Sequence, residues 1–333
     1  MKKVLSMLVV FVMVFGLVAC GERIKNSENS SEITLCLDWT PNTNHTGFYV
    51  AAAKGYYEEM GLEVKIVQPP ENGAALMCAS GQAQFAIDAQ DTLAPSLAND
   101  NPLEVSAVAA ILQHNTSGII SRKGEGADRP KGLQNKTYST WDNPTELAMV
   151  KHIVEKDGGD FEKVNLIPNV ITDEAEALKN GDTDSVWIYY GWSGINAQMK
   201  GLSFDYFSFS DCEEIFDYYT PVIIGNNTFL ETEKEKAKSF ISATKKGYEY
   251  AAENPEEAAE ILINGDDTGS LSGSEEFVKE SQKWISEKYI DDASSFGIID
   301  EDRWNSFYLW LFENGLIEKK LSENAGLNLD FIG

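Results

Sequence analysis

The sequence has 333 residues, 43% of them hydrophobic, and a formal net charge of −26. That much apolar material can bury a core, so the composition excludes a disordered chain, and the length suits one large domain or two ordinary ones. Carboxylates in such excess repel phosphate backbones and anionic lipid headgroups, which argues against nucleic acid as a partner.

The first thirty residues predict export. Two lysines precede an apolar run over residues 4–18, and small residues lead to Cys20. This pattern is typical of a secretory signal, here residues 1–19. The cysteine just after the cut resembles the bacterial lipobox, which implies a diacylglyceryl anchor on Cys20. An ordinary signal peptide with a chance cysteine is the alternative. The polar residues 20–31 then form a flexible tether.

The remaining cysteines, Cys36, Cys78 and Cys212, fit no metal-ligand spacing. An odd number cannot pair completely within one chain. We expect buried free thiols, with a Cys36–Cys78 disulfide as the alternative.

The body of the chain predicts α/β architecture, because short apolar runs alternate with helical patterns. In the first part, strands are expected over residues 33–37, 62–67, 85–87 and 105–112, and helices from about 47 and over 74–79 and 93–97. Residues 122–135 are polar with glycine and proline, which indicates a domain crossing.

A second series of elements begins at residue 137. Strands are expected from 137 and over 164–167 and 186–189, and helices over 144–156 and 173–179. Residues 218–224 predict a strand at an edge or a crossing, because Pro221 lies inside it. The last third predicts helices over 231–252, 255–263, 275–289 and 302–312. Their Trp284, Trp304 and Trp310 are expected in the core.

Two α/β lobes account for this order of elements. Lobe 1 would comprise residues 32–121 and 222–333, and lobe 2 residues 122–221. Ligands of α/β domains bind beyond the carboxyl ends of the strands, so the site is expected between the lobes.

Few residues suggest catalysis. The three histidines, His45, His114 and His152, form no metal-ligating pair. Residues 191–195 read GWSGI, which is not a nucleophile elbow, and no phosphate-binding or dinucleotide motif is present. We therefore expect a binding protein without metal or cofactor.

Aromatic residues follow the predicted strands. The candidates for lining a cleft are Trp39, Tyr189, Tyr190, Trp192, Tyr218 and Tyr219, whereas Trp187 lies inside a strand and is expected in the core. A flat heterocycle stacked on such rings gains roughly 0.5–1.5 kcal/mol per aromatic pair beyond its area burial. Burial in the core is the alternative for the other rings as well.

Polar residues near these aromatics would complete the site. The candidates are Asp38, Asn42, His45 and Gln90. A carboxylate at the end of a buried strand needs a donor, which a ligand amino group can supply. Alternatively, Asp38 caps the helix that begins near residue 47.

Residues 38–51 read DWTPNTNHTGFYVA and resemble the signature of binding proteins related to thiamine-pyrimidine synthesis enzymes. Residues 53–57, 80–87 and 188–192 add to the resemblance, which covers roughly 32–315. It implies a periplasmic-binding-protein fold of the second type, closing over its ligand at a hinge.

The resemblance also implies a function. The chain would be a monomer that delivers a small aromatic solute to an ABC permease and its ATPase. Formyl-aminomethylpyrimidine or hydroxymethylpyrimidine would be the solute. Asp38 and Asn42 would meet its ring nitrogens or amino group, and Trp39 and Tyr190 would stack on it.

Other ligands stay open, as do two other classes of protein: an enzyme of pyrimidine synthesis, and a surface adhesin or scaffold on the same fold. Ser193 stands where an acidic residue is expected in pyrimidine binders, which leaves riboflavin or another aromatic solute as alternatives. A sulfonate is disfavoured because the four arginines lie away from the motifs. Fungal relatives are enzymes that consume an active-site histidine and use a cysteine-rich iron-binding segment, which nothing here resembles.

Overall fold

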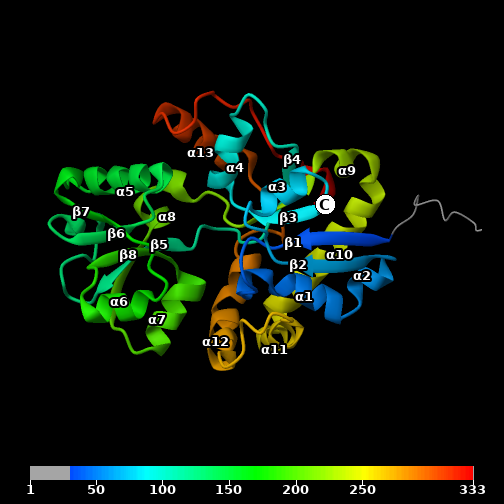
Figure 1. Cartoon of the computed structure of the whole chain (residues 1–333), viewed down its shortest axis with the longest axis horizontal. Helices are drawn as coiled ribbons and strands as arrows, with labels where there is room; N and C mark the ends of the chain where they lie inside the picture. Colours follow the sequence, from blue (N-terminus) through cyan, green and yellow to red (C-terminus); the bar gives the residue numbers. More distant parts are fainter. Residues whose placement is uncertain (1–30, 333) are drawn as a thin grey trace, which may run out of the picture. The chain divides into compact units, whose positions relative to one another are not determined.

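The computed structural model describes residues 31–332, which contain two five-stranded sheets (Figure 1). Sheet A consists of β1 (Glu32–Cys36), β2 (Glu63–Val67), β3 (Phe85–Asp88), β4 (Val105–Ala110) and β10 (Val222–Asn226). Sheet B consists of β5 (Ser117–Arg122), β6 (Thr137–Thr140), β7 (Asn165–Pro168), β8 (Ser185–Tyr189) and β9 (Phe204–Ser208). The predicted signal peptide and Cys20 lie outside the described residues.

Both sheets follow one plan. The strand orders are β2-β1-β3-β10-β4 in sheet A and β7-β6-β8-β5-β9 in sheet B. In each sheet the first three of these strands are parallel, and the fourth runs antiparallel to both of its neighbours. The chain enters sheet B along β5 and returns to sheet A along β10. The predicted fold class, two α/β lobes, is confirmed.

The strand pairing differs from the predicted partition in one respect. β5 belongs to sheet B, so the first crossing precedes Ser117, whereas the sequence suggested a crossing near residue 120. Of the two predictions near Pro221, an edge strand or a crossing, the edge strand was wrong because β10 pairs on both sides, whereas Pro221 itself lies on the crossing that precedes β10. Pro221 stands just before the first paired residue, where its missing N–H breaks no ladder bond.

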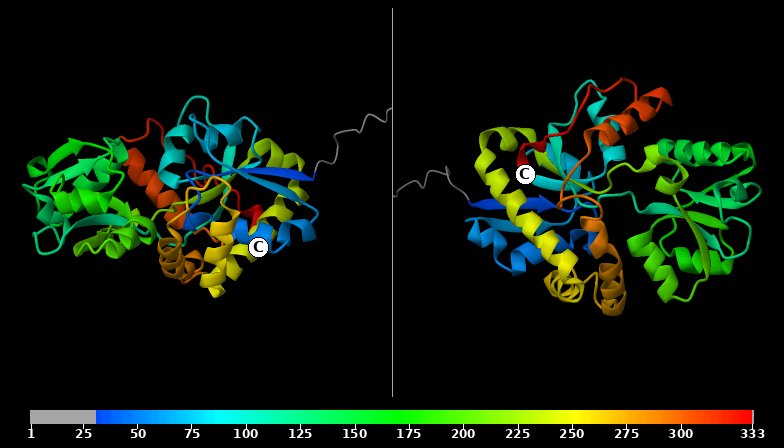
Figure 2. Two further views of the ribbon diagram at one scale, coloured as in Figure 1. Left: turned by 60° about the horizontal axis from the view of Figure 1, so that its bottom comes forward. Right: turned by 180° about the vertical axis from the view of Figure 1, so that it is seen from behind.

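The helices cover both sheets (Figure 2). They are α1 (Thr46–Ala53), α2 (Tyr56–Glu59), α3 (Ala74–Ala79), α4 (Gln90–Leu97), α5 (Pro144–Lys156), α6 (Glu174–Asn180), α7 (Ile195–Met199), α8 (Phe209–Cys212), α9 (Asn227–Thr232), α10 (Lys234–Glu253), α11 (Pro255–Gly265), α12 (Glu275–Ile285) and α13 (Glu301–Glu313). In residues 31–332 none of them is long and apolar enough to span a bilayer.

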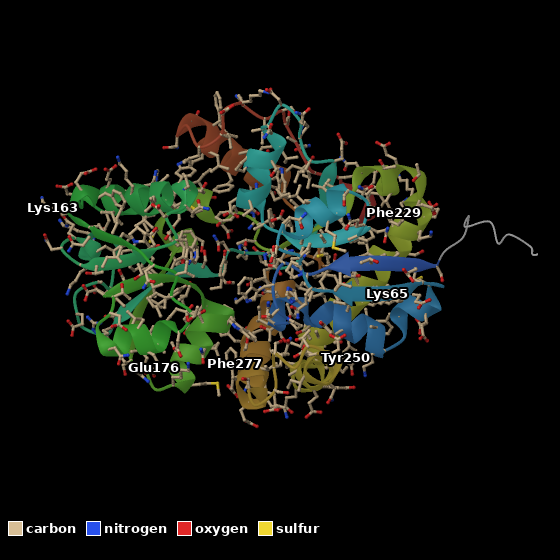
Figure 3. The ribbon with its side chains drawn as sticks, in the orientation of Figure 1. Lys65, Lys163, Glu176, Phe229, Tyr250 and Phe277 are labelled. Atoms are coloured by element: carbon tan, nitrogen blue, oxygen red, sulfur yellow. The ribbon has the colours of Figure 1, made fainter. Side chains whose placement is uncertain are left out.

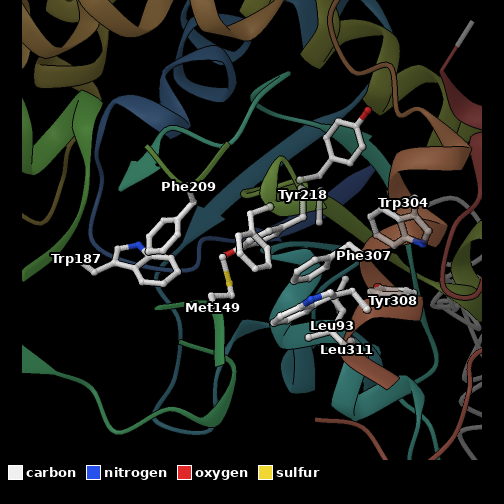
Figure 4. Close-up of a cluster of buried hydrophobic side chains, with 14 of the residues drawn as sticks. Leu93, Met149, Trp187, Phe209, Tyr218, Trp304, Phe307, Tyr308 and Leu311 are labelled. Atoms are coloured by element: carbon white, nitrogen blue, oxygen red, sulfur yellow. The ribbon is translucent and has the colours of Figure 1, made fainter. Parts of the chain in front are cut away.

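Apolar side chains pack on opposite faces of sheet A. One cluster joins β1 and β3 to α1, α10, α11 and α12, and the other joins the sheet to α3, α4 and α13. The second cluster continues past Tyr218 to Met149, Trp187 and Phe209 of sheet B and its helices (Figure 4). Trp187 is therefore a core residue, as predicted, and the two sheets share part of one core.

The cysteines of the described part are free thiols. Cys36 and Cys78 are buried, as expected, and Cys212 is partly exposed. Burial raises the pKa of Cys36 to about 11, so this thiol is unreactive at neutral pH.

Glycines let α1 and α10 approach each other closely. A Cβ atom added at Gly247 would lie 2.1 Å from the carbonyl oxygen of Gly47. We expect Gly247→Ala to lower the free energy of unfolding by about 1–3 kcal/mol, because overpacking outweighs the helix propensity of alanine. Urea unfolding of both proteins measures this difference.

The matched control is Ser242→Ala, an exposed position on the same helix. It should change stability by no more than about 0.5 kcal/mol. A Gly247→Ala protein as stable as this control would contradict the close helix packing.

Candidate functional site

Residues from both sheets meet at Tyr189, the last residue of β8. Its phenol interacts electrostatically with Asp38 and Asp91, and it hydrogen-bonds with the side chain of Thr220. Asp38 follows β1 and Asp91 follows β3, whereas Thr220 lies on the second crossing. Burial raises the pKa of Tyr189, so the phenol stays neutral. We call Asp38, Asp91, Tyr189 and Thr220 the Tyr189 site.

Asp38 is held by the turn that precedes α1. Nε2 of the fully buried His45 lies 2.7 Å from Oδ1 of Asp38. The backbone N–H of Asn42 donates to Nδ1 of His45 at 3.3 Å, so Nε2 carries the proton and donates to Asp38. The side chain of Asn42 caps the turn by accepting from the N–H of Asn44. His45 and Asn42 therefore orient the Asp38 carboxylate, and this imidazole is neutral.

Exposed indoles follow two of the strands that end near the site. Trp39 comes directly after Asp38 and is 69% exposed, so it is not a core residue. Trp141 comes directly after β6, is 40% exposed and packs against Trp187 with ring centroids 5.6 Å apart. The sequence pattern that selected Trp39, an aromatic just past a strand, also applies to Trp141.

Tyr190 and Trp192 contact a different part of the molecule. The ring of Tyr190 lies 5.0 Å from that of Trp284, and Trp192 packs edge-on against Phe277 at 4.4 Å. Both partners belong to α12, which carries the labelled Phe277 in Figure 3. Tyr190 and Trp192 lie beyond the end of β8, in the helical turn Tyr190–Gly194, which explains why they contact other elements than Tyr189 does. Tyr190 and Trp192 thus join sheet B to α12, and their predicted stacking role stays a prediction.

Gln90, Tyr218 and Tyr219 are buried at the second crossing. The Gln90 amide accepts from the N–H of Tyr219 at 2.9 Å and donates to the carbonyl of Trp304 at 2.8 Å. Tyr218 stacks on Phe307 with ring centroids 4.2 Å apart (Figure 4). These side chains connect the crossing to α4 and α13, and their contacts are with protein groups.

A polar cluster joins the two crossings. Nδ1 of His114 lies 2.6 Å from Oδ2 of Asp217, and Arg303 donates to the same oxygen at 2.7 Å. The backbone N–H of Asn115 donates to Oδ1 of Asp217 at 2.8 Å. Nε2 of His114 also contacts Asp292. We call these five residues the hinge cluster, because His114 and Asp217 lie on different crossings.

Protonated His114 should stabilise the hinge cluster. The hydrogen bond with Asp217 raises the pKa of His114 above its usual value, while Arg303 opposes the rise. This stabilisation is full below about pH 6.5, the pKa of histidine in the unfolded chain, and is lost as the pH rises through the folded pKa.

We therefore expect His114→Gln to destabilise the protein more at pH 5.5 than at pH 8.5. The difference should be at most about 1 kcal/mol, because the imidazole is 35% exposed and solvent screens it. Urea unfolding at both pH values measures it, and an equal loss of stability at both would contradict the assignment.

Two hollows lie away from the Tyr189 site. One, of about 660 Å³, borders the hinge cluster and is lined by Asp217, Asp302 and Arg303, among others. The other, of about 360 Å³, is lined by Tyr190 and Tyr206, among others. The first is rich in carboxylates and the second in aromatic rings.

Comparison with known proteins identifies the family. The model of the family described as NMT1/THI5 like matches residues 42–258. The chain belongs to this family. The formylaminopyrimidine-binding protein of Halalkalibacterium halodurans is 28% identical over 320 residues, which cover 95% of each chain. A 4-amino-5-hydroxymethyl-2-methylpyrimidine phosphate synthase of Saccharomyces cerevisiae is 24% identical, covering 71% of this chain and 72% of its own.

Solved structures agree on the fold. The aliphatic sulphonate binding protein of Escherichia coli superposes with a TM-score of 0.67 at 9% identity, covering 88% of this chain and 96% of that one. A Candida albicans protein described as having the generic periplasmic binding protein fold gives 0.59 at 16% identity, covering 90% and 98%. This member of the NMT1/THI5-like family therefore has a periplasmic-binding-protein fold.

In this family member no sequence pattern marks Asp91 or Thr220 as a site residue. Asp91 comes right after Gln90. The sequence does not show that the side chain of Asp91, and not that of Gln90, acts on Tyr189. Ser117 was also missed, because β5 was not predicted. It pairs with Tyr189 across the ladder, and its Oγ atom is buried without a hydrogen-bond partner among residues 31–332.

Proposed function

We propose that this chain is the extracytoplasmic solute-binding lipoprotein of an ABC importer and that it captures an aminopyrimidine precursor of thiamine. The observation that carries the proposal is the relative named for binding formylaminopyrimidine, which aligns over 95% of both chains. Formyl-aminomethylpyrimidine is the leading ligand and hydroxymethylpyrimidine the next.

The chemistry of the Tyr189 site supports an amino-substituted ring. Trp39, which follows Asp38 in the chain, offers an exposed aromatic face. A ring stacked there could donate its amino hydrogens to Asp38, whose other partner, His45, already fixes the orientation of the carboxylate.

Transport requires a closing motion and a location at the membrane. Two chain crossings between the sheets allow one lobe to rotate against the other, as in other two-lobed proteins that close around ligands. A diacylglyceryl group on Cys20 would keep a monomeric protein beside its permease and ATPase. We place the lobe boundaries just before Ser117, because β5 belongs to sheet B, and at residue 221, just before β10.

We propose binding without catalysis. The Saccharomyces cerevisiae synthase aligns over 71% of this chain, against 95% for the binding protein. Incubation with formyl-aminomethylpyrimidine followed by mass spectrometry should return the ligand unchanged. A converted product would favour the enzymatic alternative.

Isothermal titration tests the proposed ligand. The panel contains formyl-aminomethylpyrimidine, hydroxymethylpyrimidine, thiamine, riboflavin and an alkanesulfonate. We expect micromolar or tighter binding of at least one aminopyrimidine, about −8 kcal/mol, and none of the sulfonate. Binding of riboflavin alone would reassign the cargo, and the absence of heat with every aromatic compound would refute an aromatic solute.

A further inference from the structure

One buried carboxylate oxygen near Tyr189 has no protein donor. Asp91 lies in the first turn of α4, beyond the carboxyl end of β3. Its carboxylate interacts with the backbone N–H groups of Asp91 and Thr92. The side chain is partly exposed, but its Oδ1 atom is buried and lacks a hydrogen-bond partner within the described residues. Native proteins seldom leave a buried acceptor unpaired, because its desolvation is costly.

Three tyrosine phenols from different elements lie within electrostatic range of Asp91. The phenols of Tyr189, Tyr218 and Tyr308 all interact electrostatically with its carboxylate. They come from β8, the second crossing and α13, so the Asp91 carboxylate acts on side chains from both lobes. The Tyr308 hydroxyl is also buried without a partner in this part of the chain. Burial raises the pKa of each of these phenols, so all three stay neutral.

The charges that act in this region are negative. Asp88 acts on Asp91, and Asp38 acts on Asp88 and on Tyr189. The contact of Asp38 with His45 adds no positive charge, because that imidazole is neutral. Burial and Asp88 raise the pKa of Asp91 to about 6, so the group is largely ionised at neutral pH. Such a site repels anions and attracts a ligand that brings positive charge.

We propose that Asp91 is the specificity-determining carboxylate of the Tyr189 site and that it selects solutes with an amidine-like edge. Such an edge is a nitrogen beside an amino group, which together donate two N–H bonds and carry positive charge. Paired N–H donors match a carboxylate in a bidentate arrangement. An aminopyrimidine acquires the edge when its adjacent ring nitrogen takes a proton from solvent. The inference rests on the solute-binding function proposed above and specifies its ligand class.

Titration calorimetry at pH 7.5 tests the role of Asp91 with three probes. These are formyl-aminomethylpyrimidine, its analogue with methyl in place of the amino group, and benzamidine, an aromatic amidine unrelated to thiamine. Asp91→Asn should weaken binding of the two amino compounds at least about tenfold and leave the methyl analogue within about threefold. Asp100→Asn, an exposed carboxylate beyond the other end of α4, is the matched control.

The outcomes separate the two proposals. Equal affinity of wild type and Asp91→Asn for formyl-aminomethylpyrimidine overturns the role of Asp91 and leaves the proposed function intact. Asp91-dependent binding of benzamidine without binding of any aminopyrimidine overturns the thiamine assignment and supports the role of Asp91. If the wild-type protein binds neither formyl-aminomethylpyrimidine nor benzamidine, the proposed function and the role of Asp91 are both refuted. If Asp91→Asn does not fold, as judged by thermal unfolding, Asp91→Ser provides the same test.

Discussion

Replacing Tyr189 by alanine is expected to weaken aminopyrimidine binding about 100-fold, or about 2.7 kcal/mol. The charges of Asp38 and Asp91 and the side chain of Thr220 all act on the Tyr189 phenol, so its loss removes an aromatic surface and a hydroxyl from the Tyr189 site. Calorimetric titration of formyl-aminomethylpyrimidine into both proteins measures the change.

The neighbouring tyrosine provides the control for Tyr189. Tyr190→Phe removes a hydroxyl that accepts from Gln198 at 2.6 Å and keeps the ring packed on Trp284. It should change the affinity less than about threefold. The reverse pattern, with loss of binding in Tyr190→Phe and none in Tyr189→Ala, would move the site toward Trp284 and α12.

Trp39→Ala is expected to weaken binding about 30-fold without changing the stability of the unliganded protein. A stacking indole at the centre of an interface contributes about 2 kcal/mol or more. The side chain is 69% exposed, so its removal should alter the free energy of unfolding by no more than about 0.5 kcal/mol. Calorimetry and urea unfolding of the same preparation give both values.

A second exposed aromatic is the control for Trp39. Phe312 on α13 is 36% exposed and lies on a different element. Phe312→Ala should leave the affinity unchanged. Wild-type affinity in Trp39→Ala would remove the indole from the site, and a large loss of stability would show that the exposed placement is wrong.

Most of the fold could be predicted from local patterns. The helix over residues 144–156 is predicted with the bounds that α5 has, because Pro144 suits the first turn. The structure adds a cap from the Asn143 side chain. β5 escaped prediction because it mixes Ser117 and Gly118 with apolar residues and lacks a clear alternation. Its pairing with β8 and β9 across the sheet provides the stabilisation that its sequence does not reveal.

The site could be predicted only in part. Asp38, Trp39 and Tyr189 follow or end strands, and this placement is readable from apolar runs and turns. Whether Tyr189 or Tyr190 faces the carboxylates depends on the register of β8, which a pattern leaves uncertain by one residue. Tyr218 and Tyr219 are predicted to line the cleft because they lie at a predicted crossing. They are buried because α13, far away in the sequence, packs over them.

The most direct test is a crystal structure of the protein with formyl-aminomethylpyrimidine. The ring should lie against Tyr189 and Trp39, with its amino group within hydrogen-bonding distance of Asp38 or Asp91. A ligand found in the hollow beside Asp217 and Arg303, or stacked on Tyr190 away from the carboxylates, would contradict the Tyr189 site.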